Sequence, residues 1–241
     1  MSTPLCQVVE WARPFVSNLM LLGDANGVDP ALTNANIILG TILGPPFVWE
    51  WNRNTAELTL TATDTDIQQA IADFGFIECA SIKVPSGASS DANTIYNLQP
   101  VRKLEMSYQP GRPSFICVFL DDMAGNITFR VGSVSPDLAY LVVVTYQKAL
   151  LPMKNIAGTL PIPDKLMHIF RYGFLALAFL YNQDSRFEAI NQKFIGSLLS
   201  AQGGLTETER NIFLSNWYSM ISDEGIVALR NQQSIQARGI Q

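Results

Sequence analysis

The spacing of apolar residues changes twice along this chain, and these two changes constrain the fold more than any single motif. Residues 5–22 and 30–43 repeat apolar side chains at the spacing of an α-helix. From about residue 47 to residue 147 the chain consists of short runs of β-forming residues separated by turn residues. The helical spacing returns after Pro163. A run of strands between runs of helices is typical of an α+β protein, so we expect an α+β fold.

The first change of spacing falls within the segment LGPPFVWEWNRN, residues 43–54. The preceding helix should begin at Asp29 and end at the Gly-Pro-Pro sequence, because proline cannot continue a helix. In a strand that starts here, Phe47, Trp49 and Trp51 would point to the same face. We interpret this aromatic stripe as packing that seats the first strand against the helices. A contact with a partner and a ligand-binding platform are the alternatives.

The middle of the chain predicts a large antiparallel β region. Its clearest hairpin joins residues 114–120 to residues 126–131 through the turn sequence DDMAGN. Residues 140–146 are apolar on both faces, so we expect a central strand that helices cover on one side. The small and polar residues 84–94 predict a surface loop.

The last third of the chain predicts three helices followed by a polar tail. The first of these helices begins at Pro163 and carries the most apolar stretch of the sequence. Ser185 with Glu188, and Thr206 with Glu209, have the spacing of a capping box, so each pair is expected to open a further helix.

This organisation predicts that both ends of the chain form one helical domain. Residues 1–46 and 160–222 make up this domain, in which the N-terminal helix pair packs against the C-terminal helices. A β domain, residues 47–159, is inserted between them. Residues 223–241 are polar and rich in glutamine, and we expect them to form an extended C-terminal tail.

The composition indicates a protein that buries surface against other subunits. Of its 241 residues, 48% are hydrophobic and only 15% are charged, which is little charge for the surface of a soluble monomer. We therefore expect a homo-oligomer. The net charge of −5 gives no basic footprint for nucleic-acid recognition.

The sequence predicts neither export nor membrane insertion. The N-terminus lacks the basic and apolar segments of a signal peptide. The most apolar stretch is interrupted by His168 and Arg171, and it is shorter than the roughly 20 residues of a membrane span. The cysteines Cys6, Cys79 and Cys117 are scattered, which indicates a reduced, intracellular protein whose cysteines are small buried side chains.

No residue pattern indicates catalysis, a cofactor or a metal. His168 is the single histidine, and we expect a hydrogen-bonded core or interface residue rather than a general base. The carboxylate pairs Asp64/Asp66 and Asp121/Asp122 lack the glycine and the distal glutamate of a calcium loop, so we interpret them as turn residues. Phosphate-binding loops and nucleophile elbows are also missing from the sequence. We therefore expect a protein that is not an enzyme.

Two segments resemble a known family. They are ANIILGTIL followed by FVWEWN, and IPDKLMHIFRYGFLALAFLYNQD. These segments, together with the order of the expected elements, resemble the head-to-tail adaptor (neck) proteins of tailed bacteriophages, especially those of the tail tubular protein A type from short-tailed phages. The chain departs from that pattern in a longer β region around residues 77–113, which leaves a related neck or tail-completion protein open.

The resemblance implies a structural virion protein. Members of that family form a ring, usually of twelve copies, between the portal protein and the tail nozzle, and the genome passes through the lumen. The protein would be made in the host cytoplasm and would reside in the neck or tail of the particle. The alternatives are another phage component, such as a tail terminator or a tube subunit, and a monomeric hydrolase that uses His168 or a carboxylate pair.

Seven residues are our candidates for structural or interface roles. They are Phe47, Trp49, Trp51, Pro163, Arg171, Arg230 and Arg238.

Overall fold

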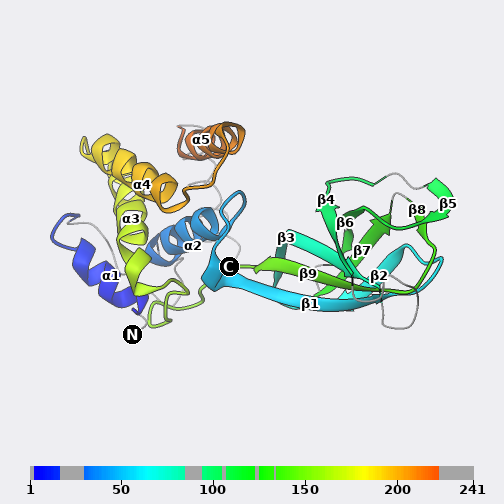
Figure 1. Ribbon diagram of the computed structural model, residues 1–241. Helices are drawn as coiled ribbons and strands as arrows, with labels where there is room; N and C mark the ends of the chain where they lie inside the picture. Colours follow the sequence, from blue (N-terminus) through cyan, green and yellow to red (C-terminus); the bar gives the residue numbers. More distant parts are fainter. Residues whose placement is uncertain are drawn as a thin grey trace, which may run out of the picture. The chain divides into compact units, whose positions relative to one another are not determined.

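The chain folds into two compact units in the computed structural model (Figure 1). The helical unit comprises Met1–Phe47 and Leu151–Gln241, and the β unit comprises Val48–Leu150. The expected α+β class is confirmed. The structure describes residues 3–16, 30–84, 94–104, 107–122, 125–132 and 134–222.

The helical unit is formed from both ends of the chain. Its described helices are α1 (Leu5–Ala12), α2 (Pro30–Leu43), α3 (Met167–Tyr181), α4 (Phe187–Ala201) and α5 (Glu207–Ile221). The helix expected over residues 5–22 ends at Ala12, because Pro14 has no N–H with which to continue the helical hydrogen bonds; residues 17–22 lie outside the described residues. The second helix ends before Gly44-Pro45-Pro46, as the sequence predicted.

Residues 151–159 belong to the helical unit, although we expected them in the β domain. Main-chain hydrogen bonds tie this segment to the N-terminus: the Leu5 N–H donates to the Gly158 carbonyl at 3.1 Å. The Asn36 side chain on α2 also donates to the Met153 carbonyl at 3.1 Å and accepts from the Met153 N–H at 2.8 Å. These bonds place the domain boundary at Leu150 and Leu151.

Helix α3 lies at the centre of the helical unit and is buried along most of its length. A Cβ atom on Gly173 would lie 2.8 Å from Phe194 of α4 and 2.9 Å from Ile38 of α2. The missing side chain of Gly173 leaves room for the side chains of Phe194 and Ile38 against the backbone of α3. The N-terminal and C-terminal helices therefore pack together, as expected.

The capping boxes that the sequence predicts at the starts of α4 and α5 are confirmed for α5 alone. The capping box of Thr206 and Glu209 is present at the start of α5. The one expected at Ser185 is not: the residue before α4 is Arg186, in helical conformation and without a side-chain cap. The Asp184 carboxylate is instead engaged by the Arg186 side chain, which shifts the start of the helix by one residue.

The β unit contains a mixed sheet. Its described strands are β1 (Arg53–Leu60), β2 (Asp66–Ala70), β3 (Phe74–Lys83), β4 (Ile95–Pro100), β5 (Ser107–Gly111), β6 (Phe115–Asp121), β7 (Asn126–Gly132), β8 (Val134–Pro136) and β9 (Tyr140–Lys148). The main sheet has the order β1-β9-β3-β4-β6-β7-β2, and β5 pairs with β8 beside it.

The expectation of a purely antiparallel region is wrong at two pairings. Strand β6 runs parallel to β4, and β8 runs parallel to β5. The long connection through residues 101–114 returns the chain to the starting end of β4, which a tight hairpin cannot do. The expected hairpin of β6 and β7 is confirmed, and Gly125 in its turn has a φ of 95°.

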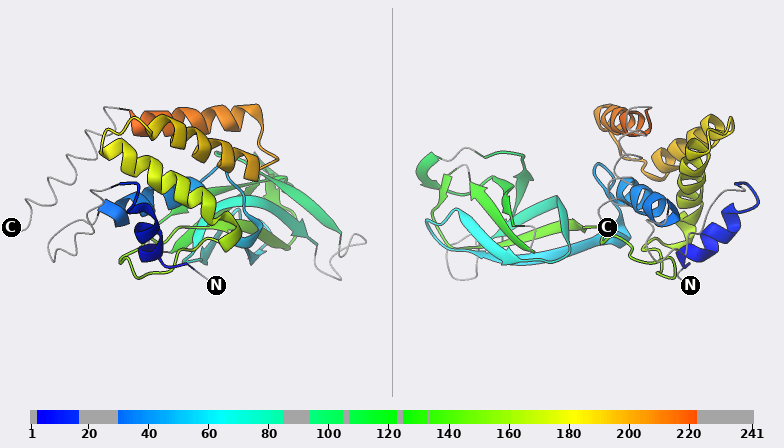
Figure 2. Two further views of the ribbon diagram at one scale, coloured as in Figure 1. Left: turned by 90° about the vertical axis from the view of Figure 1, so that its left-hand side faces the viewer. Right: turned by 180° about the vertical axis from the view of Figure 1, so that it is seen from behind.

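The sheet curls so that its strands share one apolar core (Figure 2). Strand β9 lies between β1 and β3, which confirms its central place. Its side chains alternate: Val142 and Val144 are fully buried, whereas Leu141 and Val143 are half-buried. The buried face of β9 packs in the apolar core of the β unit itself rather than under helices, which corrects the expectation that helices cover one side of this strand.

We expect Gly173→Ala to destabilise the protein. The added methyl group collides with Phe194 and Ile38, which costs about 1–3 kcal/mol in the free energy of unfolding. Gly196→Ala on α4 is the matched control, because no atom lies within 4 Å of its added Cβ. The control should gain about 1 kcal/mol from helix propensity. Urea denaturation measures both, and equal effects would contradict the packing role of Gly173.

We also expect Gln183→Gly to stabilise the protein. Gln183 follows α3 with a φ of 53°, a left-handed conformation that favours glycine, and its N–H donates to the Leu180 carbonyl. Relief of this strain should add about 1 kcal/mol to the free energy of unfolding. Gln202, which ends α4 with a φ of −112°, is the control, and Gln202→Gly should bring no gain. Thermal denaturation of the two variants checks this difference.

Candidate functional site

The segment 47–53 does not begin the first strand, which corrects the expected aromatic stripe. Residues Glu50–Asn52 form a 3-10 turn, closed by the Asn52 N–H donating to the Trp49 carbonyl at 3.0 Å. Strand β1 starts only at Arg53. Phe47, Trp49 and Trp51 therefore do not share one face of a strand.

Phe47 belongs to the helical unit. Its side chain is fully buried, and its ring meets Phe213 of α5 edge to face, with 4.9 Å between the ring centroids. The contact joins the end of α2 to α5, so Phe47 packs the helical unit rather than the sheet.

Trp49 and Trp51 belong to the β unit, where their rings lie 5.9 Å apart. The main-chain N–H of Trp49 donates to the Oε1 atom of Gln147 at 3.1 Å. The side chain of Asn52 donates to the Lys148 carbonyl at 3.1 Å. A backbone group and a side chain of this segment are thus hydrogen-bonded to β9, the strand that pairs with β1.

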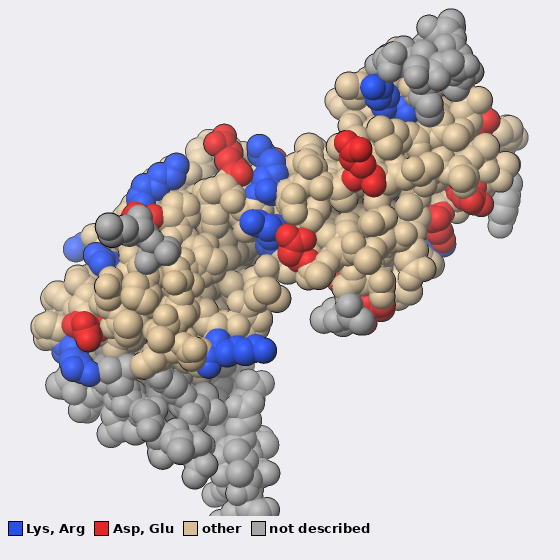
Figure 3. Space-filling model, turned by 90° about the horizontal axis from the view of Figure 1, so that it is seen from below, with Lys and Arg blue, Asp and Glu red and all other residues tan. Residues whose placement is uncertain are grey.

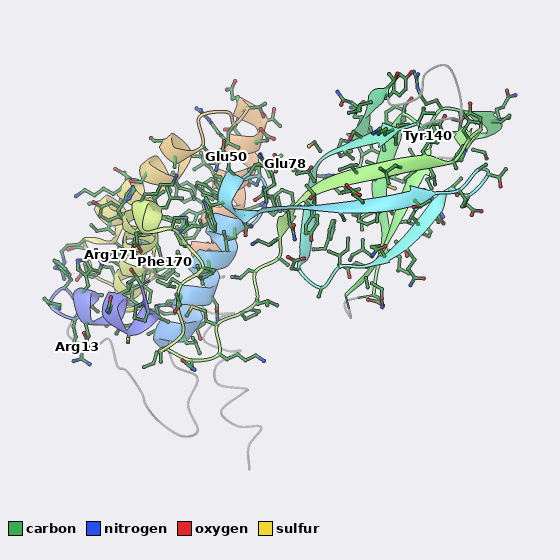
Figure 4. The ribbon with its side chains drawn as sticks, turned by 60° about the horizontal axis from the view of Figure 1, so that its bottom comes forward. Arg13, Glu50, Glu78, Tyr140, Phe170 and Arg171 are labelled. Atoms are coloured by element: carbon green, nitrogen blue, oxygen red, sulfur yellow. The ribbon has the colours of Figure 1, made fainter. Side chains whose placement is uncertain are left out.

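The Glu78 carboxylate completes this polar network (Figure 4). It accepts from the Nε2 atom of the fully buried Gln147 at 2.8 Å and from the Nε atom of Arg53 at 2.8 Å. Burial alone would raise the pKa of Glu78, but the hydrogen bonds from Arg53 and Gln147 outweigh it, and the pKa lies below its ordinary value. Asn52 and Arg53, the polar residues that follow Trp51, are therefore structural partners of β9 and β3.

The other candidates lie in the helical unit or outside the described residues. Pro163 is half-buried and precedes the short 3-10 turn Asp164–Leu166 that leads into α3. Arg171 is half-buried, and its guanidinium lies 5.4 Å from the centre of the Trp11 ring. Arg230 and Arg238 lie outside the described residues, as does the tail 223–241.

Arg171, one of the sequence candidates, lies beside residues of α1 and the turn after it that the sequence did not indicate. We define the α1 patch as Trp11, Arg13, Phe15 and Arg171. The ring of Phe15 is 5.5 Å from that of Trp11, and the Phe15 side chain is 43% exposed. The Nε atom of Arg171 is buried without a hydrogen-bond partner. Figure 4 labels Arg13 and Arg171, which come from neighbouring elements, and Phe170, which faces the core.

A pocket of about 130 Å³ opens between α2 and α5. It is lined by Gly40, Thr41, Pro45, Phe213, Asn216, Trp217 and Met220. Gly40 is exposed in the interior of α2, and no atom lies within 4 Å of a Cβ placed on it. The glycine within a helical pattern is the sequence signal that could have revealed this pocket.

Apolar side chains are also exposed elsewhere. Ile212 is 47% exposed on α5, and Phe119 and Leu120 are 54% and 57% exposed on β6. On the face drawn in Figure 3, charged side chains are scattered and most of the described surface is uncharged. These surfaces agree with the low content of charge in the sequence.

The described candidates for hydrolase chemistry, His168, Asp66 and Asp122, each have a local polar partner. His168 is exposed rather than buried, with its Nδ1 atom 3.1 Å from the Lys165 carbonyl. Asp66 forms an ion pair with Arg130. Asp122 accepts from the Asn126 N–H at 2.9 Å and holds the hairpin turn.

The described residues contain neither a metal-binding cluster nor a helix that could span a membrane. Nowhere among them do three or more His, Cys, Asp or Glu side chains gather as a metal site would require. The helices in the described part of the chain are also too short or too polar to cross a bilayer. Cys117 is buried, and burial raises the pKa of its thiol, whereas Cys79 is exposed, contrary to expectation.

Comparison with known proteins does not assign this chain to a family. No protein-family model matches the sequence, and no curated protein sequence is significantly similar to it.

We expect Glu78→Ala to destabilise the β unit. The substitution leaves the buried Nε2 atom of Gln147 without its acceptor, which costs about 1–3 kcal/mol in the free energy of unfolding. Glu57→Ala is the matched control, because Glu57 is an exposed residue of β1. Urea denaturation measures both variants, and an equally small effect for the two would contradict the role of the network.

The same carboxylate should make stability depend on pH. The pKa of Glu78 is lower in the folded chain than in the unfolded one, so its contribution is present above the unfolded pKa and is lost as pH falls through the folded pKa. Between about pH 5 and pH 3 the free energy of unfolding should fall more steeply for the wild type than for Glu78→Gln. Parallel slopes would show that Glu78 does not contribute.

Proposed function

We propose that this protein is a structural component of a phage virion, a head-to-tail adaptor that forms a homo-oligomeric ring between portal and tail nozzle. The observation that carries the proposal is the insertion of a β unit into a helical unit built from both ends of the chain. This is the organisation that the resemblance to neck proteins implies. The segments that carry the resemblance form α2, the turn after it, and α3 with the residues that flank it.

The surface of the molecule supports assembly into an oligomer. Exposed Phe15 and Ile212 in the helical unit, and Phe119 and Leu120 in the β unit, are large apolar side chains that burial against another subunit would remove from water. The net charge of −5 suits a ring through which DNA passes, because like charge discourages binding of the DNA to the wall.

Each part of the chain has a role in this proposal. The helical unit forms the body of the ring and contacts the portal. The β unit, with the loop 84–94, faces the next tail component, the nozzle or the tube. The tail 223–241 gains its order on the portal, because a segment with few apolar residues offsets its ordering entropy only on binding. The loop, apart from its ends, and the tail lie outside the described residues.

The mass of the purified protein, measured alone and with the portal protein of the same particle, tests this function. We expect a closed ring, either alone or on the portal, in the neck of the virion. A uniform stack of copies in electron micrographs would point instead to a tail tube subunit or terminator. A monomer under both conditions would contradict the proposal.

Deletion of residues 225–241 should impair attachment to the portal. The described buried residues of the helical unit all precede this segment, so the melting temperature should change little. Sedimentation of the truncated protein with the portal measures attachment, and the full chain is the control. Undiminished attachment would show that the tail is not the portal contact.

A further inference from the structure

The helical unit carries two different surfaces on opposite sides of α3, as Figures 1 and 2 show for α1 and α5. One is the α1 patch, which projects an aromatic ring. The other is the pocket between α2 and α5, which is hollow. We propose that the α1 patch of one copy inserts Phe15 into the α2–α5 pocket of the next copy. This inference rests on the proposed function as a ring.

Phe15 is held in place before any contact forms. Its N–H donates to the Ala12 carbonyl at 2.9 Å, and its carbonyl accepts from the Arg186 guanidinium at 2.9 Å. Its ring contacts that of Trp11, and the Arg171 guanidinium lies 5.4 Å from the centre of the Trp11 ring. An exposed phenyl ring that is fixed in this way loses little conformational freedom on binding.

The pocket has the size and the lining for one such ring. An apolar cavity of about 150 Å³ holds one benzene molecule, and the pocket measures about 130 Å³. Phe213, Trp217 and Met220 supply the apolar part of the lining, and Thr41 and Asn216 supply polar groups at its side. Ile212, 47% exposed, lies on the same row of α5 as Asn216 and Met220, and it extends the apolar surface beyond the pocket.

The α1 patch carries a positive charge that the helix end beside the uncharged pocket favours. Arg13 lies two residues before Phe15, is exposed, and forms no ion pair with any residue that the structure describes. The pocket lies near the C-terminal end of α5, and the last turn of this helix contains no basic residue. The carbonyl groups at a helix C-terminus carry partial negative charge, so they favour a neighbouring arginine.

The two surfaces differ, so the contact is heterologous. Such a contact leaves a free α1 patch on one side and a free pocket on the other, and it repeats in one direction until a ring closes. A two-fold dimer would instead bring the same surface of both copies together. The proposed occupant of the α2–α5 pocket is therefore Phe15 of a second copy of this chain.

Gly40→Leu tests the contact by filling the pocket from within the chain. No atom lies within 4 Å of a Cβ on Gly40, so the helix should tolerate the substitution, and the subunit association constant should fall about tenfold to hundredfold. Gly196→Leu is the matched control, an exposed helical glycine on α4 with the same free space. It should leave association unchanged. Phe15→Ser, which removes the inserted ring, should weaken association as Gly40→Leu does.

Cysteine cross-linking tests the direction of the contact. With the exposed Cys79 replaced by Ser, Arg13→Cys, which keeps the Phe15 ring, and Met220→Cys are prepared as separate proteins. A mixture of the two should form cross-linked dimers on oxidation, and neither protein alone should. Self-cross-linking of either variant would overturn the heterologous arrangement.

The outcomes separate this inference from the function it rests on. A wild-type ring that Gly40→Leu and Phe15→Ser leave intact would overturn the contact while the adaptor function stands. A wild-type chain that stays monomeric alone and on the portal would contradict the adaptor function, and this contact with it. Melting temperatures near that of the wild type establish that each variant is folded.

Discussion

The close approach of three helices at Gly173 is the contact on which the helical unit depends. Helix α2 comes from the first part of the chain, and α3 and α4 come from the last part. The missing side chain of Gly173 lets Ile38 and Phe194 reach the backbone of α3. This packing makes one unit from two distant segments, and so it turns the β unit into an insertion. The pocket and the α1 patch both lie on the outside of this packed group.

Polar contacts join the start of the β unit to its end. Glu78 on β3 accepts from Arg53 and Gln147, and Gln147 in turn accepts from the backbone of Trp49. The residues that enter and leave the unit are thereby bonded to each other. Because Gln147 is fully buried, its amide needs hydrogen-bond partners, and Glu78 and the Trp49 backbone supply them.

Sequence reasoning reached those features whose causes are local. The Gly-Pro-Pro end of α2, the capping box of Thr206 and the hairpin of β6 and β7 depend on residues within a few positions of one another. The turn at Glu50–Asn52 does not, since it is stabilised by Gln147 and Lys148 from the other end of the β unit. An alternating aromatic pattern therefore predicted a strand where tertiary contacts make a turn. The parallel pairing of β4 with β6 is equally non-local.

Building one helical unit from both ends of the chain has a consequence for biosynthesis. The ribosome releases α2 first, then the whole β unit, and only afterwards α3 and α4. Until then Ile38 and Leu39 of α2, fully buried in the finished protein, have no partner helix. The β unit, whose strands lie within one continuous segment, can complete its core while synthesis continues. Vectorial synthesis thus makes the exposed face of α2 the surface that a chaperone would protect in the nascent chain.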